Sequence, residues 1–332
     1  MADLTAATRH EQRGPAEGES WLERYRAELI GYCYRMLGSA AEAEDAVQET
    51  LTRAWQGFDA FEGRSALRSW LYRIATNVCL NMRKSGQRRA RPMDLASPAV
   101  AGAPPRAALP EAVWIEPIPD LPLAAGGDPA ELVVSRERIS LAFVAALQYL
   151  TPRQRAVLIM RDVLSLRADE VAESLDTTVA AVKSTLQRAR AALAGREVIE
   201  PEPYRPADAA QRALLARYVD AFQRHDFDAL VALLHEDATM SMPPFPWWLR
   251  GREEIRRVLL GGGGGACRGA RLMPTVANGS PAFGQYRPSG EGGHEPFALV
   301  VTEVSGGRII GVTTFLEATG LFPSFALPPR LP

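Results

Sequence analysis

Residues 64–91 read RSALRSWLYRIATNVCLNMRKSGQRRAR and contain eight Arg and Lys residues but no Asp or Glu, although the chain of 332 residues has a formal net charge of −1. Apolar residues recur at helical offsets and form one stripe: Leu67, Leu71, Ile74, Ala75, Val78 and Met82. The opposite side of the predicted helix carries Trp70, Arg73, Asn77 and Lys84, with Arg68 and Tyr72 at its edges. The stretch therefore predicts an amphipathic helix with one apolar face and one cationic, aromatic face.

The cationic face suits a single strand of nucleic acid. Cations follow the phosphates, aromatic rings stack on unpaired bases, and an Asn side chain can read a base edge. A second interpretation remains open, in which Trp70 or Tyr72 packs in the core and the cations are merely solvated. The absence of any acid in the stretch favours binding to a polyanion.

Composition describes a globular chain that is long enough for two or three domains. Apolar residues make up 47% and charged residues 23% of the sequence. Three Cys and four His residues are widely scattered, so we expect no disulfide framework, no metal site and no cofactor. The first twenty residues lack the apolar core of a signal peptide, and no apolar run approaches the ~20 residues of a membrane span. We therefore expect a cytoplasmic protein without membrane contact.

Changes in amino-acid composition and in the spacing of apolar residues divide the chain into five predicted parts. Residues 1–20 form a polar N-terminus, 21–91 and 131–200 are helical blocks, 92–130 is a linker rich in Pro, Ala and Gly, and 201–332 combines helices with short strands. Within the linker, the segment VWIEPIPDLPL at residues 113–123 is unusually apolar. Either this segment docks on another part of the protein, such as the C-terminal domain, or it is a flexible spacer with incidental apolar residues.

An acidic helix precedes the cationic one. In AEAEDAVQETLTRAW, residues 41–55, the predicted buried stripe consists of Ala43, Val47, Thr50, Leu51 and Ala54. Asp45, Gln48 and Glu49 are left facing outward. Taken alone, this pattern favours a solvated face whose acids complement the dipole at the start of the helix.

The second helical block has the pattern of a helix-turn-helix. Thr151 and Pro152 predict a helix start, and a short helix over 167–174 leads through LDTT into a second helix. The predicted buried stripe of that second helix is Val179, Val182, Leu186, Ala189 and Leu193, and its outward residues include Lys183, Ser184, Gln187, Arg188 and Arg190. An ordinary helical hairpin is the alternative. A small residue at the helix crossing, Ala172, and the absence of acids over 177–196 favour a helix that enters the major groove.

Together, these blocks resemble the sigma-70 family of bacterial RNA polymerase subunits, and specifically its extracytoplasmic-function type, group IV. Residues 25–55 resemble regions 2.1 and 2.2 of that family, residues 58–91 resemble regions 2.3 and 2.4, and residues 150–193 resemble region 4, with no evident region 3 between them. The combination of AEDAVQET, SWLYRIATN and VKSTLQRARAAL is far more specific than any one motif.

The resemblance implies roles for individual residues. Asp45, Gln48 and Glu49 would dock on the clamp of the polymerase large subunit, which replaces the interpretation of a solvated face. The residues implied in binding the opened −10 element are Arg68, Trp70, Arg73, Asn77, Lys84 and Arg88. Those implied in binding the −35 duplex are Lys183, Ser184, Gln187, Arg188 and Arg190.

The C-terminal part resembles a different fold, the SnoaL-like, NTF2-type α+β cone, in which helices and a curved sheet enclose a pocket. ALLARYVDAFQRHDFDALVALL predicts a helix pair, and FALVVTEV and RIIGVTTFLE predict strands around a Gly-Gly turn. Candidate pocket residues are Tyr218, Asp237, Trp247, Trp248 and Arg250. Only the resemblance would bring these residues together, so we expect ligand sensing or regulation and not catalysis. Sigma factors with this appended domain include the mycobacterial SigG-like subgroup, which the chain resembles.

These expectations combine into one predicted architecture and function. The fold class is multidomain: two all-α sigma modules, the region 2 bundle and the region 4 helix-turn-helix, followed by an α+β cone. The expected function is that of a sigma factor that binds core RNA polymerase, recognises −10 and −35 elements and promotes promoter melting, with the C-terminal domain regulating in cis. An anti-sigma factor and a small-molecule ligand are further partners left open. The alternative is a stand-alone helix-turn-helix regulator with a ligand-binding C-terminal domain.

Overall fold

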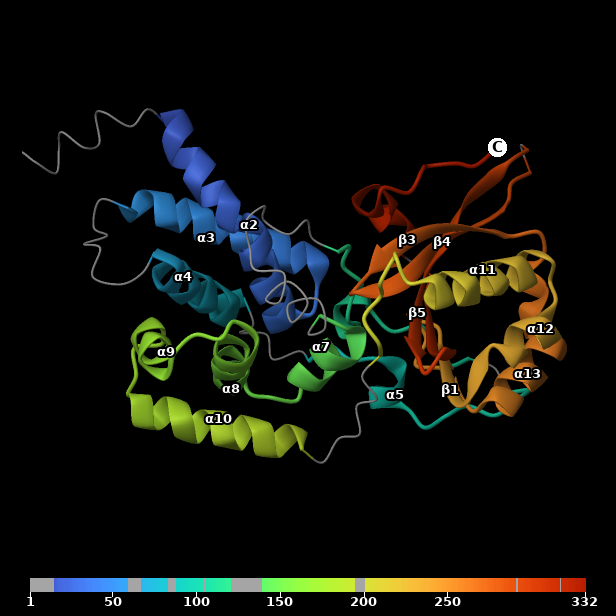
Figure 1. The fold of residues 1–332 in the computed structure, drawn as a ribbon, viewed down its shortest axis with the longest axis horizontal. Coiled ribbons are helices and arrows are strands. Elements are labelled where there is room, and N and C mark those ends of the chain that lie inside the picture. The colour runs from blue at the N-terminus through green and yellow to red at the C-terminus, as the bar shows by residue number, and fades with distance from the viewer. Residues whose placement is uncertain are drawn as a thin grey trace, which may run out of the picture. The chain divides into compact units, whose positions relative to one another are not determined.

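The computed structural model describes residues 15–58, 67–82, 88–103, 105–120, 139–194, 201–290, 292–316 and 318–332, with the backbone alone described for 15–24 (Figure 1). Contacts divide the chain into two compact units. One comprises Met1–Gly86, Leu121–Ser135 and Tyr149–Gly195; the other comprises Gln87–Asp120, Arg136–Gln148 and Arg196–Pro332. The described linker residues therefore group with the C-terminal part of the chain.

Three helices form the first half of the helical unit: α2 (Pro15–Leu37), α3 (Ala40–Gln56) and α4 (Leu67–Met82). The side chain of Ser39 caps α3 by accepting a hydrogen bond from the Glu42 amide at 3.1 Å. The predicted apolar stripe of α4 is buried at its centre, where Leu71, Ala75 and Val78 lie, whereas Met82 in the last turn is 39% exposed. The apolar repeat therefore predicted the buried face of α4 correctly at its centre but wrongly extended that face to Met82.

The second half of the helical unit contains α8 (Pro152–Leu158), a π-helical turn (Ile159–Val163), α9 (Ala168–Ser174) and α10 (Val179–Leu193). Thr151 caps α8 as predicted, because its hydroxyl accepts from the Gln154 amide and Pro152 begins the helix. The turn between α9 and α10 confirms the predicted helix-turn-helix. Val179 is 38% exposed, so the buried stripe of α10 begins one turn later than predicted.

The two halves are joined by buried polar contacts. The Arg155 side chain, 0% exposed, donates hydrogen bonds to the carbonyl oxygens of Met36 and, at 3.2 Å, Leu150. The Ser174 hydroxyl on α9 shares its hydrogen between the carbonyl oxygen of Glu170 in its own helix, at 2.8 Å, and that of Ser69 on α4, at 3.3 Å. Since buried carbonyl groups need partners, these bonds tie α8 to the end of α2 and α9 to the start of α4.

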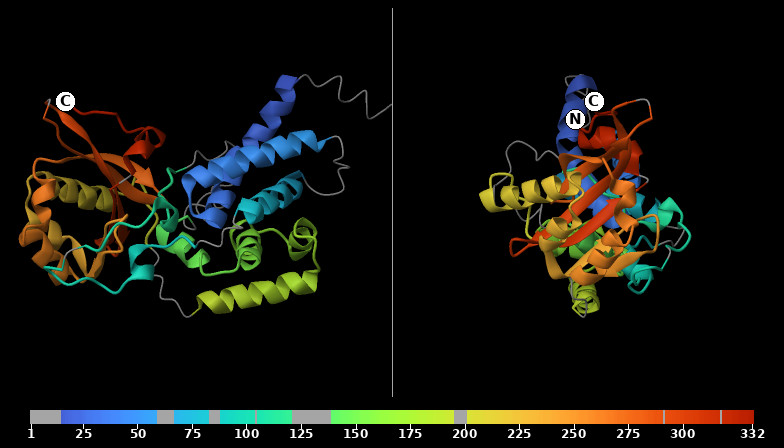
Figure 2. Two further views of the ribbon diagram at one scale, coloured as in Figure 1. Left: turned by 180° about the vertical axis from the view of Figure 1, so that it is seen from behind. Right: turned by 90° about the vertical axis from the view of Figure 1, so that its right-hand side faces the viewer.

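The second unit is built on a six-stranded sheet of order β2-β1-β6-β5-β4-β3 (Figures 1 and 2). The strands are β1 (Leu234–Ser241), β2 (Trp248–Arg250), β3 (Arg271–Ala277), β4 (Ser280–Pro288), β5 (His294–Ser305) and β6 (Arg308–Phe315). Only the β1–β6 pair is parallel. The helices α11 (Ala209–Gln223), α12 (Phe227–Ala232) and α13 (Arg252–Leu260) contribute to one core with the sheet, in which Tyr218 and Phe222 pack near Phe283.

The described linker is docked within this second unit. It contains α5 (Pro92–Leu95) and a 3-10 turn (Glu111–Val113), and the unit also takes in α7 (Leu141–Leu147). Trp114, Ile115 and Ile118 are buried, which confirms the docked interpretation of the apolar segment for residues 113–120; residues 121–123 lie outside the described residues.

One side chain, that of Asn278, holds the linker to the sheet. It lies in the turn between β3 and β4 with a φ of 54°, a conformation that Asn tolerates better than most residues. Its Oδ1 accepts from the Ile118 amide at 3.0 Å, and its Nδ2 donates to the carbonyl oxygen of Ile139 at 2.9 Å. The turn therefore connects the linker at Ile118, and the chain at Ile139 just before α7, to the sheet. In the part of the chain that the structure describes, every helix is too short or too polar to cross a bilayer.

Candidate functional site

The acidic side chains of α3 lie together on its exposed face. Asp45, Gln48 and Glu49 are all exposed, whereas Ala46 and Val47 between them are buried against the neighbouring helices. The Glu49 carboxylate accepts from the Arg53 guanidinium at 2.6 Å, an exposed i,i+4 pair. Asp45 and Glu49 therefore project from one turn to the next as a polar surface that a partner could cover.

The cationic face of α4 is narrower than the sequence predicts. Arg73 and Asn77 are exposed one turn apart, and Trp70 is partly buried beside them. The Arg68 guanidinium is bound to Glu28 of α2, with Nε 2.6 Å from the carboxylate. Of the residues predicted for this face, Arg73 and Asn77 are therefore exposed and Trp70 is partly exposed, and these are called the open face.

Tyr72, expected at the edge of the cationic face, is a core residue. It is 1% exposed, its hydroxyl donates to the Glu28 carboxylate at 2.5 Å, and its ring meets that of Tyr32 edge-on at 5.0 Å. Burial raises the pKa of the Tyr72 phenol well above its usual value, and the adjacent Glu28 charge adds to this effect. The second interpretation of the sequence therefore holds for this aromatic residue, because α2 covers that side of α4.

The basic residues that follow α4 in the sequence differ in burial and in the unit to which they belong. Lys84 lies outside the described residues. Arg88 is exposed, but it belongs to the second unit and not to the unit that contains α4. Arg89, counted in the basic stretch, is buried; its guanidinium donates to the Trp114 carbonyl oxygen at 2.8 Å and pairs with Glu116 at 3.1 Å. Arg89 is thus a structural cation, since its charge is already compensated.

The outward residues of α10 occupy one exposed surface. All five predicted residues are exposed: Lys183, Ser184, Gln187, Arg188 and Arg190. The Arg190 guanidinium is bidentate to Asp162, at 3.0 and 2.7 Å, which links α10 to the end of the π-helical turn. Lys183 and Gln187 lie one turn apart, so both can reach the same groove of a duplex.

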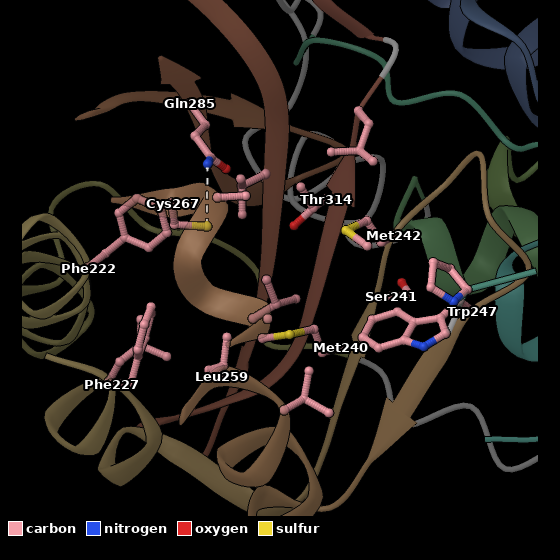
Figure 3. Close-up of a pocket in the computed structure, with 18 of the residues that line it drawn as sticks. Phe222, Phe227, Met240, Ser241, Met242, Trp247, Leu259, Cys267, Gln285 and Thr314 are labelled. Atoms are coloured by element: carbon pink, nitrogen blue, oxygen red, sulfur yellow. Dashed lines mark hydrogen bonds between the residues drawn. The ribbon is translucent and has the colours of Figure 1, made fainter. Parts of the chain in front are cut away.

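The second unit contains a cavity of about 530 Å³ (Figure 3). Phe222 and Phe227 lie on one side, Trp247 lies on the opposite side, and Met240 projects between them. Tyr218 and Trp247 are the two candidate pocket residues that line it. The lining also includes three linker residues, which sequence reasoning did not identify: Gly102, Ala103 and Pro105.

Three other candidate pocket residues lie elsewhere. Asp237 and Arg250 are exposed on β1 and β2, and neither lines the cavity. Trp248 is buried, and its indole nitrogen donates to the carbonyl oxygen of Ala96 in the linker at 2.8 Å. Successive residues of an extended chain point to opposite sides, so Trp247 faces the cavity while Trp248 faces the linker.

The described lining residues supply no proton-transfer group suited to neutral pH. Burial raises the pKa of the Tyr218 phenol and that of the Cys267 thiol, which keeps both groups neutral. Arg257 is the one charged residue among them, and it is paired with Glu254. Among the described residues, no three His, Cys, Asp or Glu side chains are placed to hold a metal ion. The lining is therefore predominantly apolar and suited to binding.

Comparisons with known proteins agree with this arrangement. The family model of Sigma-70 region 2 matches residues 21–89, that of Sigma-70, region 4 matches residues 140–193, and that of the SnoaL-like domain matches residues 215–312. These matches confirm the predicted fold class of two sigma modules followed by an α+β cone.

Relatives in Mycobacterium tuberculosis extend the match over the whole chain. The ECF RNA polymerase sigma factor SigG is 40% identical over 341 aligned residues, which cover 100% of this chain and 90% of SigG. SigJ, another ECF sigma factor, is 28% identical over 73% of this chain and 72% of its own length. The crystal structure of SigJ covers 93% of this chain and 99% of its own, with a TM-score of 0.56 and 24% identity, and so shares the fold. The chain therefore belongs to the sigma-70 family, as an ECF RNA polymerase sigma factor that carries a C-terminal SnoaL-like domain.

Proposed function

We propose that the protein binds core RNA polymerase, recognises the −10 and −35 elements of its promoters and holds one strand of the melted −10 region. The observation that carries this proposal is the presence of two exposed, acid-free faces, on α4 and α10, in a chain whose full length resembles an ECF sigma factor. Each face suits a different form of DNA: the aromatic one a single strand, the other a duplex.

The acidic surface of α3 is the proposed polymerase contact. Asp45, Gln48 and Glu49 project from the side of α3 that faces away from the helical core. Exposed carboxylates steer a basic partner and fix its register, more than they add affinity. The surface is separate from the face of α4, so one side chain need not serve both partners.

The face of α4 is the proposed contact with the opened −10 element. Trp70 offers a ring for stacking, Arg73 offers a charge to a phosphate, and Asn77 offers an amide to a base edge. Arg68 has a positioning role in this proposal, because its bond to Glu28 holds the start of α4 against α2. Lys84 and Arg88 extend the proposed contact from the sequence resemblance alone.

The surface of α10 is the proposed contact with the −35 duplex. Ser184 and Gln187 can form hydrogen bonds with base edges, and Lys183 can contact a phosphate. Arg190 would reach DNA only by sharing or leaving Asp162. Arg188 is exposed, with a 3.3 Å bond to Thr185 of its own helix.

Regulation in cis is the proposed role of the C-terminal domain. Its support is the docking of residues 88–103 and 105–120 within the second unit, through buried apolar side chains and through Asn278. Because this linker joins the two sigma modules, the amount of linker that is docked sets how much chain is left to span between them. A change in docking would therefore alter how the two modules reach their promoter elements.

Transcription with purified core polymerase tests the proposal. We expect core with the full-length protein to start transcripts on fragmented genomic DNA at positions that core alone does not use, preceded by a shared pair of sequence elements. Duplex DNA binding without core, together with no new start sites, would instead support a stand-alone helix-turn-helix regulator.

The Asp45→Ala/Glu49→Ala variant tests the assignment of the polymerase surface. We expect weaker binding to core in a pull-down titration. The matched control is Asp220→Ala/Arg224→Ala, which removes an exposed ion pair on α11. If the two variants bind core equally well, the assignment of α3 is wrong, although the sigma-factor proposal would stand.

A further inference from the structure

A segment of the linker, here called the arm and consisting of residues 99–103 and 105–109, forms part of the cavity wall. Its backbone is held at three points by other residues of the second unit. The Ala99 amide donates to the Trp248 carbonyl oxygen at 2.7 Å, the Ala101 amide donates to the Glu254 carboxylate, and the Leu109 amide donates to the Pro244 carbonyl oxygen at 2.9 Å. Between these points, the arm places Gly102, Ala103 and Pro105 at the cavity.

The carboxylate of Glu254 links the arm to the lining of the cavity. It accepts from the Ala101 amide and also pairs with Arg257, which lines the cavity. The Glu254 side chain is only 16% exposed, whereas that of the neighbouring Glu253 is 71% exposed. A partly buried carboxylate with two donors is held firmly, so arm position and cavity lining are connected through one side chain.

The chemistry of the lining identifies a class of ligand. Most of the lining is aliphatic, aromatic or thioether carbon, including Phe222, Met240 and Val312 (Figure 3). The indole N–H of Trp247 is buried without a hydrogen-bond partner, and the Gln285 amide has only a long bond of 3.8 Å to the Cys267 sulfur. These groups would bind an acceptor on an otherwise apolar molecule. The volume of about 530 Å³ is within the range of cavities that hold drug-sized ligands.

We propose that this cavity binds a neutral, largely apolar small molecule and that the arm closes over it, so that ligand binding and arm docking stabilise each other. A ligand in the cavity contacts Gly102, Ala103 and Pro105 only while the arm is docked. It therefore binds the docked form more tightly and, by linkage, raises the docked fraction. The proposal extends the proposed regulation in cis, on which it rests for its effect on transcription but not for binding.

Binding of N-phenylnaphthylamine, a neutral aromatic probe whose fluorescence rises in apolar sites, tests the proposal on the full-length protein. We expect saturable binding to the wild type and an affinity at least fivefold lower in Glu254→Ala, because this variant weakens arm docking. The matched control, Glu253→Ala, removes a carboxylate that does not contact the arm and should bind as the wild type does. Absence of saturable binding, or equal affinity in the two variants, would overturn the proposal.

Limited proteolysis measures the position of the arm without using the probe signal. Arg106 is an exposed residue of the arm and offers trypsin a cleavage site before Ala107. We expect saturating probe to slow cleavage at Arg106 several-fold relative to other sites in the same digest, and Glu254→Ala to accelerate it. Unchanged cleavage at Arg106 despite saturable binding would show a ligand site uncoupled from the arm and would refute the coupling.

Both measurements are made without polymerase, which separates the two proposals. Probe binding and protection of Arg106, with no effect of the probe on initiation, would leave the cavity proposal intact and contradict regulation in cis. Initiation that depends on the protein while the probe fails to bind would contradict the cavity proposal alone.

Discussion

The exposed faces of the helical unit and the cavity of the second unit differ in how many segments build them. The face of α4 and the surface of α10 each come from one helix, so the side chains that share a face are fixed by a repeat of 3.6 residues. The cavity takes residues from the arm, from α11, α12 and α13, and from several strands. Which side chains share a surface made by one helix does not depend on contacts elsewhere in the chain. The cavity, in contrast, depends on contacts between residues as far apart in the sequence as Ala101 and Glu254.

The largest effect on stability is expected from a substitution in the helical unit that removes contacts between segments far apart in the sequence. Arg155→Ala removes the guanidinium that donates to the carbonyl oxygens of Met36 and Leu150 and opens a void in the core. We expect a loss of about 3 kcal/mol in the free energy that protects α8 and the end of α2 from opening, measured by hydrogen exchange with mass spectrometry. Arg153→Ala, on the exposed side of the same helix, should change protection by less than about 0.5 kcal/mol. Equal effects of both variants would mean that Arg155 does not join the two halves.

A smaller effect, on transcription initiation, is expected from substitutions on the open face of α4. Arg73→Ala/Asn77→Ala should lower initiation by about 10- to 100-fold, because a phosphate contact and a base contact are each lost. Binding to core should stay within about twofold, since α3 is unchanged. The measurement is run-off transcription from a mapped promoter, with a template already mismatched at −10 expected to restore most of the activity. Failure of that template to help would place the defect outside promoter opening.

A third effect tests the contact that docks the linker on the second unit. Asn278→Gly keeps the backbone freedom of the turn and the backbone bond from residue 278 to the Ile118 carbonyl oxygen, but it removes the side-chain bonds to Ile118 and Ile139. We expect protection of the linker around Ile118 to fall by about 1–2 kcal/mol in hydrogen exchange, while the strands β5 and β6 keep theirs. Uniform loss over the whole sheet would indicate that Asn278 stabilises the domain and not linker docking in particular.

The smallest effect separates the buried aromatic residue of α4 from the partly exposed one. Tyr72→Phe removes the hydroxyl that donates to Glu28 and should cost about 1 kcal/mol of stability, with initiation nearly unchanged. Trp70→Ala, at the open face, should lower initiation by several-fold with little loss of stability. Denaturation monitored by circular dichroism and run-off transcription together distinguish the two. A large loss of initiation in Tyr72→Phe, beyond that expected from stability, would make Tyr72 part of the DNA contact.

Helical periodicity, caps and motif order were readable from the sequence because they depend on near neighbours. The repeat of apolar residues predicted the inner faces of α3, α4 and α10, and the Thr151-Pro152 pair predicted the start of α8. The same repeat placed Lys183 and Gln187 on the outside of α10. Three motifs in order also identified the family, which the full-length match to SigG confirms.

Contacts across long stretches of chain were decided only by the tertiary structure. The sequence grouped Trp247 with Trp248, yet their side chains serve the cavity and the linker separately. Arg89 was counted only within the basic stretch 64–91, and its charge is compensated by Glu116, 27 residues away. The Asn278-Gly279 pair is a recognisable turn signal, but nothing local showed that the Asn amide would bind Ile118 of the linker and Ile139 beyond it. Local periodicity determines which way a side chain points, whereas its partner is set by packing between segments that the sequence keeps far apart.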